Sequence, residues 1–521
     1  MTLHKSEKIF ESLINVENLE SYSKDDAIKF IGSLVDVSSE LKKIQGLEKA
    51  IAISGELFAQ DLTSQQLSLL YYFLGNAWSS LKVLRRHKSF KLWDYQQEEI
   101  ENEIINLRKA LKEDGFEKLS TQEKCSILTD LGNAMDYIGR FVEAIEYWDQ
   151  ALQIDSSFGM ASGNKGIGFT YYSGILYDDG HEVCPRVIFY RIAHANLELG
   201  LRSELYEDAR KRFNDIKMRI ESRYPPEDLK KNLDLDNYSL GISKSEQQYR
   251  KWCLVNRLFI NPLNDLGPYP IAARDSFAPP AIVTKIKKEE DYLGFFNQVK
   301  QEFVSARYMY YDGIKSMNPH FSDKEVRLFN TLDYPAYSLS IEKIKMAFRV
   351  IYSIFDKIAY FLNNYLKLGI QNNRVNFKTL WYESQELKKG LRQEFRQNRN
   401  WPLRGLFWLS KDLYENKPAF KESMLPDAQE IYEIRNHLEH KYLKIRNEMF
   451  SEMPNASNFT YSAYRSDFES KTLRLIKMAR ASLIYIFTAV NFEEQTRSKK
   501  REKGAHIMRL PRTEFDDNWK R

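Results

Sequence analysis

Apolar residues recur at helical spacing along most of the chain, and no segment keeps the strict alternation typical of a half-buried strand. In the C-terminal half this spacing predicts four long helices, at residues 291–311, 341–366, 427–448 and 467–492. The second of them is apolar around nearly its whole circumference, so it should form the buried centre of a helical bundle. The pattern therefore predicts an all-α fold with almost no sheet.

Proline divides the chain into parts. None of the 15 prolines lies in residues 1–184, whereas five lie in residues 262–280. Because proline breaks helix interiors, the first part can be continuously helical and the middle part cannot. We predict a helical repeat domain at residues 1–225, an irregular proline-rich connector at 226–283, a helical bundle domain at 284–495 and a basic tail at 496–521. Residues 252–266 of the connector are expected to dock the two domains together.

Small and large residues recur in a fixed order in the N-terminal part. The first copy of this pattern lies in residues 71–78 and comprises Tyr71, Leu74, Gly75 and Trp78. The second copy begins at residues 131–134 and comprises Leu131, Gly132, Asn133 and Ala134, followed by Gly139, Ala144, Ile145, Trp148, Ala151 and Leu152. Gly166 lies 34 residues after Gly132. Over residues 65–215 the chain resembles the tetratricopeptide repeat (TPR), in which small residues let paired helices approach. The resemblance implies a solenoid of helical hairpins whose concave surface binds a peptide or another protein. The alternative is that these residues only pack the solenoid.

Composition and charge narrow the class of protein. The 521 residues are 43% hydrophobic and 29% charged, which is typical of a globular chain, and no stretch reaches the roughly 18 apolar residues of a membrane span. Three cysteines (Cys125, Cys184 and Cys253) offer neither a disulfide framework nor a zinc site. We therefore expect a cytoplasmic protein without a cofactor or a metal. The net charge of +5, from 77 basic and 72 acidic residues, does not by itself indicate nucleic-acid binding, so any such site must be a local patch.

Two pairs of residues have an arginine five positions before a histidine, and their surroundings differ. Arg501 and His506 lie in a charged tail without apolar periodicity. Arg435 and His440 lie in a predicted helix whose apolar stripe is formed by Ile431, Ile434, Leu438, Tyr442 and Ile445. At 100° per residue, Arg435 flanks this stripe and His440 points about 160° away from it, with Asn436 one turn earlier on the same side. His440 is therefore predicted to be exposed.

This segment resembles the signature of the HEPN superfamily (higher eukaryotes and prokaryotes nucleotide-binding), in which an arginine and a histidine four to six residues apart lie late in a helical bundle. Many members are metal-independent ribonucleases that pair two copies of this helix face in a homodimer. The resemblance implies that Arg435, Asn436 and His440 are catalytic and that the substrate is RNA. An ordinary solvated helix face is the alternative.

The residue types suit RNA cleavage. Histidine titrates near neutral pH and can serve as a general acid or base, while the planar arginine binds phosphate oxygens and stabilises charge in the transition state. The expected products are a 2′,3′-cyclic phosphate and a 5′-hydroxyl, and DNA should resist because it lacks the 2′-hydroxyl. Asp356, a lone carboxylate in the most apolar helix, needs a partner, and Arg435 is our candidate; a purely structural ion pair is the alternative.

A second group of residues alternates arginine with tryptophan between the second and third predicted helices. It comprises Arg392, Arg396, Arg399, Trp401, Arg404 and Trp408. Such a group can hold phosphates and stack bases, or it can pin a loop to the bundle. The tail from Arg497 to Arg512, with seven basic residues and one acidic residue, could add non-specific attraction to RNA or be only a solvated tail.

Together these features predict an endoribonuclease gated by a TPR-like sensor or docking domain. Fusions of this kind resemble toxins and antiphage effectors, a role that rests on the family resemblance alone. Two alternatives remain open: a HEPN-like module that binds RNA or nucleotides without cleavage, and an adaptor whose two domains both bind proteins.

Overall fold

The computed structural model of the protein describes residues 3–86, 93–177, 185–231, 234–284, 291–316, 318–330, 333–384, 387–417, 421, 423–447, 458–500, 508 and 513–520. Over these residues it contains seventeen α-helices and one sheet of two short strands, which confirms the predicted all-α fold class. No helix in the described part of the chain has the length and apolar character that a membrane span requires.

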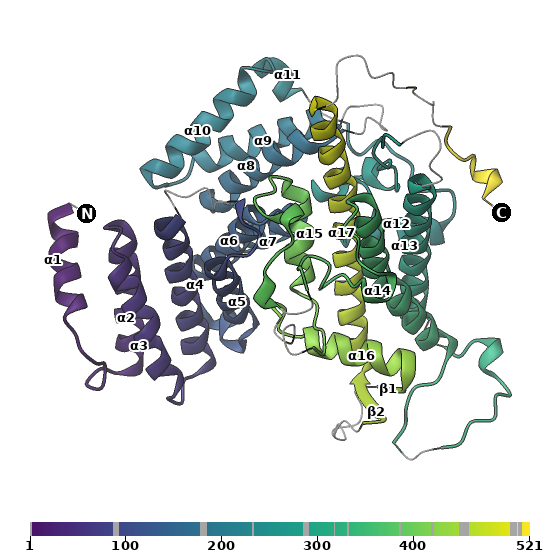
Figure 1. The fold of residues 1–521 in the computed structure, drawn as a ribbon, viewed down its shortest axis with the longest axis horizontal. Helices are drawn as coiled ribbons and strands as arrows, with labels where there is room; N and C mark the ends of the chain where they lie inside the picture. Colours follow the sequence, from purple (N-terminus) through teal and green to yellow (C-terminus); the bar gives the residue numbers. More distant parts are fainter. Residues whose placement is uncertain are drawn as a thin grey trace.

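The N-terminal part is a row of helices that pack side by side and extend away from the rest of the molecule (Figure 1). α4 packs on α5, α6 on α7 and α8 on α9 as successive hairpins. The helices are α1 (Leu3–Ile14), α2 (Lys24–Glu40), α3 (Ile44–Phe58), α4 (Ser64–Arg86), α5 (Glu98–Lys112), α6 (Thr121–Tyr137), α7 (Phe141–Ile154), α8 (Gly159–Ile175), α9 (Pro185–Leu201) and α10 (Glu207–Glu221).

Glycine allows the helices of these hairpins to approach closely. A Cβ atom on Gly132 of α6 would lie 2.6 Å from the Trp148 ring of α7, and one on Gly75 of α4 would lie 2.8 Å from Leu107 of α5. Gly166 occupies the corresponding place in the next hairpin, where a Cβ atom would lie 2.7 Å from a leucine side chain of α9. The small residues of the repeating pattern therefore have the packing role that the sequence indicates.

The connector is more regular than predicted. It contains α11 (Pro226–Lys230) and a twelve-residue helix, α12 (Lys244–Val255), whose N-terminus is capped by the Ser243 hydroxyl accepting from the Glu246 N–H at 3.1 Å. The expectation of irregular structure is wrong over α12, because that segment is free of proline and begins with a strong cap. The prolines instead start two short 3₁₀ turns, at Pro262–Asp265 and Pro270–Ala272.

The connector contacts both helical parts through one buried carboxylate. Asp265, 1% exposed, accepts from the Tyr172 hydroxyl of α8 at 2.9 Å and from Arg480 of the last helix at 2.5 Å. Arg480 also donates to the Phe259 and Asn261 carbonyl oxygens. These contacts agree with the expectation that residues 252–266 dock the two helical parts together.

The C-terminal part is a bundle built on two long helices. Its helices are α13 (Tyr292–Lys315), α14 (Leu339–Tyr365), α15 (Trp401–Ser410), α16 (Ala428–His440) and α17 (Arg465–Lys500). α14 packs on α13, α16 and α17, and it buries Ile344, Phe348, Ile351, Phe355 and Ile358. The predicted central position of this helix is confirmed.

The predicted helix at 427–448 is wrong in its second half. α16 ends at His440, and the chain continues as β1 (Tyr442–Arg446), which pairs in parallel with β2 (Thr460–Tyr464) directly before α17. Leu443 and Ile445 are buried on one face of β1, whereas the helical stripe predicted from the sequence contains Tyr442 and Ile445. Five residues are too few to distinguish the two periods, and the strand pairing across a long sequence separation decides between them.

The two helical parts share one core. A single cluster of buried apolar residues extends from Tyr95 in the N-terminal part to Val490 on α17. Buried charges cross the same contact: Arg108 of α5 and Arg140 before α7 each donate to Asp412, which follows α15, at 2.6 Å. A movement of one part against the other would therefore disrupt a packed, charged interface.

Candidate functional site

α16 carries the three predicted catalytic residues. The helix begins after Pro426 and Asp427, and Asp427 accepts two hydrogen bonds from Arg474 of α17 at 2.7 and 2.6 Å. Ile431, Ile434 and Leu438 are buried against the bundle and fix the orientation of the helix. Figure 1 shows α16 and the two strands at the N-terminal end of α17.

His440 is the last residue of α16 and is exposed, as the helical spacing predicts. Its imidazole makes no hydrogen bond with any residue that the structure describes. Asn436, one turn earlier, is half-buried and also lacks a described hydrogen-bond partner. The neighbouring His437 is different: it is 3% exposed and its Nδ1–H donates to the Glu433 carbonyl oxygen at 2.8 Å, so it is a packed core histidine.

Arg435 is half-buried between α16 and α14. Its guanidinium lies over the ring of Tyr352 of α14, 5.4 Å from the ring centroid. Within the described residues no carboxylate lies within the 4.0 Å of an ion pair with it. The arginines that join the two helical parts are different, since Arg108, Arg140 and Arg480 are each held by a buried carboxylate. Arg435 therefore keeps its hydrogen-bonding edge available for an anion.

Asp356 lies near Arg435 without forming a direct ion pair in the described structure. Burial raises the pKa of the Asp356 carboxyl and the charge of Glu415 adds to this rise, while the Arg435 guanidinium and the Phe377 N–H lower it. The predicted interaction of Asp356 with Arg435 is therefore electrostatic and involves no direct ion pair in the described structure.

Two further residues of α14 belong to this site and were not predicted. Arg349 donates to the Leu438 carbonyl oxygen at the end of α16 and lies 3.8 Å from the Glu439 carboxylate. Tyr352 supplies the ring below Arg435, and burial raises the pKa of its phenol, which therefore stays neutral. With Asp356, these residues are spaced three and four apart on α14, so a polar stripe on this otherwise apolar helix was a signal that could have identified them.

This arrangement has the chemistry of a phosphate site with an exposed acid–base group. Arg349 of α14 contacts the end of α16, Arg435 lies over the Tyr352 ring between α14 and α16, and His440 is exposed as the last residue of α16. In the described part of the chain, no group of three or more histidine, cysteine, aspartate or glutamate side chains is arranged to hold a metal ion. Arg501 and His506, the other pair with this spacing, lie outside the described residues, as do Cys184 and residues 509–512 of the basic tail.

The arginine and tryptophan residues around α15 are largely structural. Arg404 is 2% exposed, lies over the Tyr137 ring and donates to the Tyr137 carbonyl oxygen at 3.3 Å. Trp401 donates to the Asp136 carbonyl oxygen at 2.8 Å. The burial of Arg404 corrects the expectation that it contacts RNA and favours the alternative of a segment fixed to the bundle. Contact of the half-buried Trp401 with RNA stays a prediction.

The arginines before α15 have less buried positions. Arg392 and Arg396 donate through Nε to the carbonyl oxygens of Leu380 and Leu391. Arg399 lines a cavity together with Trp401. A contact of these three arginines with RNA stays a prediction.

That cavity is the hollow of the N-terminal helical row. It has a volume of about 1070 Å³ and is lined mainly by α4, α6, α8 and α10, with Trp401 and Phe492 closing it from the C-terminal part. Asn133, Asn164 and Arg219 of α10 are among the residues that line it. Binding of a peptide or another protein on this surface stays a prediction, and this cavity is the place where we expect it.

A buried carboxylate in this cavity predicts how stability depends on pH. Burial raises the pKa of Asp136 to about 7, opposed by Arg212, and its Oδ1 atom has no hydrogen-bond partner. Because this pKa is raised in the folded state, the contribution of Asp136 to stability is fully present below the unfolded pKa near 4 and is lost as pH rises towards 7. Asp136→Asn should therefore raise the thermal midpoint by about 1–3 °C at pH 8 and change it less at pH 5. Differential scanning calorimetry at both pH values, with exposed Asp215→Asn as control, measures this; an equal effect at both would contradict it.

Part of the chain, including the candidate site on α16, matches the model of a known protein family. Residues 283–493 match the family model described as LA2681-like HEPN, and this range includes Asp356, Arg435, Asn436 and His440. The match does not extend to residues 1–282, so the TPR assignment stays a prediction. No curated protein and no solved structure matches the chain. The match supports a HEPN domain at residues 283–493.

Proposed function

We propose that the protein is a HEPN-type endoribonuclease that cleaves RNA without a metal ion. The observation that carries this proposal is the pairing, on one helix of the HEPN region, of an exposed His440 with an Arg435 whose guanidinium is bound to no described carboxylate. Arg108 and Arg140 differ from Arg435 in this respect, because both donate to the buried Asp412.

His440, Arg435 and Asn436 each have a role in the proposed reaction. A histidine removes the proton of the RNA 2′-hydroxyl, the 2′-oxygen attacks the adjacent phosphorus, and the bond from phosphorus to the 5′-oxygen breaks. The departing 5′-oxygen takes up a proton, which leaves a 2′,3′-cyclic phosphate and a 5′-hydroxyl. Arg435 binds the non-bridging oxygens, where negative charge increases in the transition state, and Asn436 orients the phosphate or the imidazole.

A second copy of the chain completes the site. The reaction needs both a base and an acid, while one α16 presents one exposed imidazole. Contact of two α16 faces across a two-fold axis brings two His440 and two Arg435 residues into one cleft. We infer that the homodimer is the active form, and that the N-terminal helical row gates it by binding a peptide or protein in its hollow. A role as a toxin or antiphage effector follows from the family resemblance alone.

The experiment that tests this proposal incubates the purified full chain with RNA in EDTA. We expect cleavage that persists in EDTA, products with cyclic phosphate ends and no cleavage of the matching DNA. The rate per chain should rise with protein concentration until mass photometry shows only dimers. Binding of RNA without cleavage would support the alternative of a non-catalytic HEPN-like module, and the absence of both would favour a protein adaptor.

A further inference from the structure

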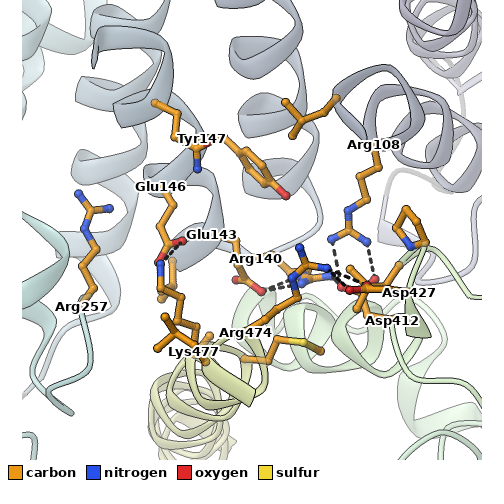
Figure 2. A pocket seen from close by; sticks show the side chains of 18 of the residues that line it. Arg108, Arg140, Glu143, Glu146, Tyr147, Arg257, Asp412, Asp427, Arg474 and Lys477 are labelled. Atoms are coloured by element: carbon orange, nitrogen blue, oxygen red, sulfur yellow. Dashed lines mark hydrogen bonds and ion pairs between the residues drawn. The ribbon is translucent and has the colours of Figure 1, made fainter. Parts of the chain in front are cut away.

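A second cavity, of about 490 Å³, lies between the two helical parts. α5 and α7 form one wall, and α17 with residues 425–427 forms the other (Figure 2). Among its described lining residues are seven arginines and lysines against four carboxylates, next to apolar side chains such as Leu111 and Met478. The lining therefore combines basic and apolar side chains, a combination suited to a small anion with an apolar portion.

The cations of this cavity differ in how firmly they are held. Arg257 and Arg480 pair with Asp149 and Asp265, which are not among the lining residues. Arg108 and Arg140 are fixed, because their side chains are 7% and 2% exposed and both are held by Asp412. Arg474 and Lys477 are 49% and 35% exposed and pair with acids at the rim. Solvent screens such partly exposed pairs, so a multiply charged ligand can displace the acid at low cost.

Several polar groups of the cavity have no partner in the described structure. Lys112 is exposed and makes no described ion pair, and the Tyr147 hydroxyl makes no described hydrogen bond. The Nε–H of Arg108, in a residue that is 6% exposed, is buried without a hydrogen-bond partner. Figure 2 shows the Tyr147 side chain extending into the cavity, with Arg108 at its other side. A buried donor left unpaired is costly and indicates an acceptor that the bound state supplies.

We propose that this cavity binds a phosphorylated small molecule of mononucleotide size. Lys112, Arg474 and Lys477 contact its phosphate groups, and the Tyr147 hydroxyl and the Arg108 Nε–H donate to its oxygens. The apolar side chains of the lining contact its uncharged portion. Lys112, which has no described ion pair, together with the partly exposed Arg474 and Lys477, favours a ligand with at least two negative charges. The volume limits it to a small ligand and excludes a folded macromolecule.

The position of the cavity connects this ligand to the proposed nuclease. Asp427, which lines the cavity, directly precedes α16 and is held there by Arg474. When Arg474 turns to a phosphate, Asp427 loses both hydrogen bonds and the start of α16 is released. Because α16 carries Arg435 and His440, the ligand changes the geometry of the proposed active site. This regulatory consequence rests on the proposed function, whereas binding in the cavity does not.

Isothermal titration calorimetry on the full chain tests the binding. The probes are ATP, GTP, CTP, UTP, AMP and inorganic phosphate, each up to 1 mM, with adenosine as an uncharged control. We expect at least one nucleotide to bind, equally well to the wild type and to His440→Ala. Lys112→Gln and Lys477→Gln should each weaken this binding about 10-fold, while Lys211→Gln, an exposed lysine of α10 outside the cavity, should not. Absence of binding by every probe, or equal weakening by Lys211→Gln, would overturn the proposal.

Hydrogen exchange tests the connection to α16 without relying on cleavage. The bound nucleotide should increase amide exchange in residues 425–434 of the wild type and of His440→Ala, and leave α2 unchanged. Unchanged exchange at the start of α16 in the bound protein would overturn the regulatory part. Because both readouts are independent of RNA, the cavity proposal and the nuclease proposal can fail separately.

Discussion

Replacing His440 with alanine is expected to lower the rate of RNA cleavage by about 100-fold or more, because removal of a positioned general acid or base typically costs about 10²–10⁴ in rate. The variant should fold normally, since His440 is exposed and its side chain contacts no described hydrogen-bond partner. The measurement is single-turnover cleavage of an end-labelled RNA, together with the thermal midpoint of each protein.

The matched control is His4→Ala, which removes an exposed histidine of α1. Its cleavage rate should equal that of the wild type. Arg435→Lys tests the second group: it keeps the charge but loses the planar fork, so we expect a large decrease in rate with RNA binding retained. Wild-type cleavage by His440→Ala would show that any nuclease activity comes from another site.

Asp412→Asn is expected to destabilise the protein by about 3–5 kcal/mol. The Asp412 carboxylate is 1% exposed and accepts hydrogen bonds from Arg108 at 2.6 and 3.0 Å and from Arg140 at 2.6 Å. Loss of its charge leaves two buried guanidinium groups with only Glu143 as counter-charge. Urea unfolding followed by tryptophan fluorescence measures the effect, which should be largest in the transition that separates the two helical parts.

Asp228→Asn provides the control, because the Lys231–Asp228 pair is 66% and 43% exposed and such pairs contribute little. The effect of pH gives a second check. The Arg108 and Arg140 charges hold the pKa of Asp412 below its usual value against the effect of burial, so its contribution is present above the unfolded pKa near 4 and is lost as pH falls through the folded pKa. The difference between wild type and Asp412→Asn should therefore diminish in acid. An effect no larger than that of Asp228→Asn would contradict the prediction.

The helices were largely predictable because their signal is local. Apolar residues three and four apart indicate a buried stripe wherever the helix packs, so the predicted 341–366 differs from α14 (Leu339–Tyr365) by two residues or fewer at each end. β1 was not predictable, because its five residues alternate only briefly. Its partner strand β2 begins only at Thr460, so the pairing is not visible in the local pattern.

The candidate site was predictable in part for the same reason. Arg435, Asn436 and His440 lie on one helix, where the spacing alone places His440 outside. Arg349 and Tyr352 were missed because their relation to α16 depends on how α14 packs against it. Arg404 was assigned to the surface from its charge, whereas its burial depends on α15 lying between two helical parts that are far apart in the sequence.

The amino-acid order alone determines the all-α class, the glycine-spaced hairpins and the exposed imidazole at the end of α16, because each depends on neighbours within a few turns of helix. Long-range packing decides the rest: which arginines are held by buried carboxylates, which one is left available over the Tyr352 ring, and where the basic cavity forms beside the start of α16. These features require side chains separated by up to some 300 positions to meet, as Arg108 and Asp412 do. The energy of a buried charge depends on such distant partners, and no local pattern records them.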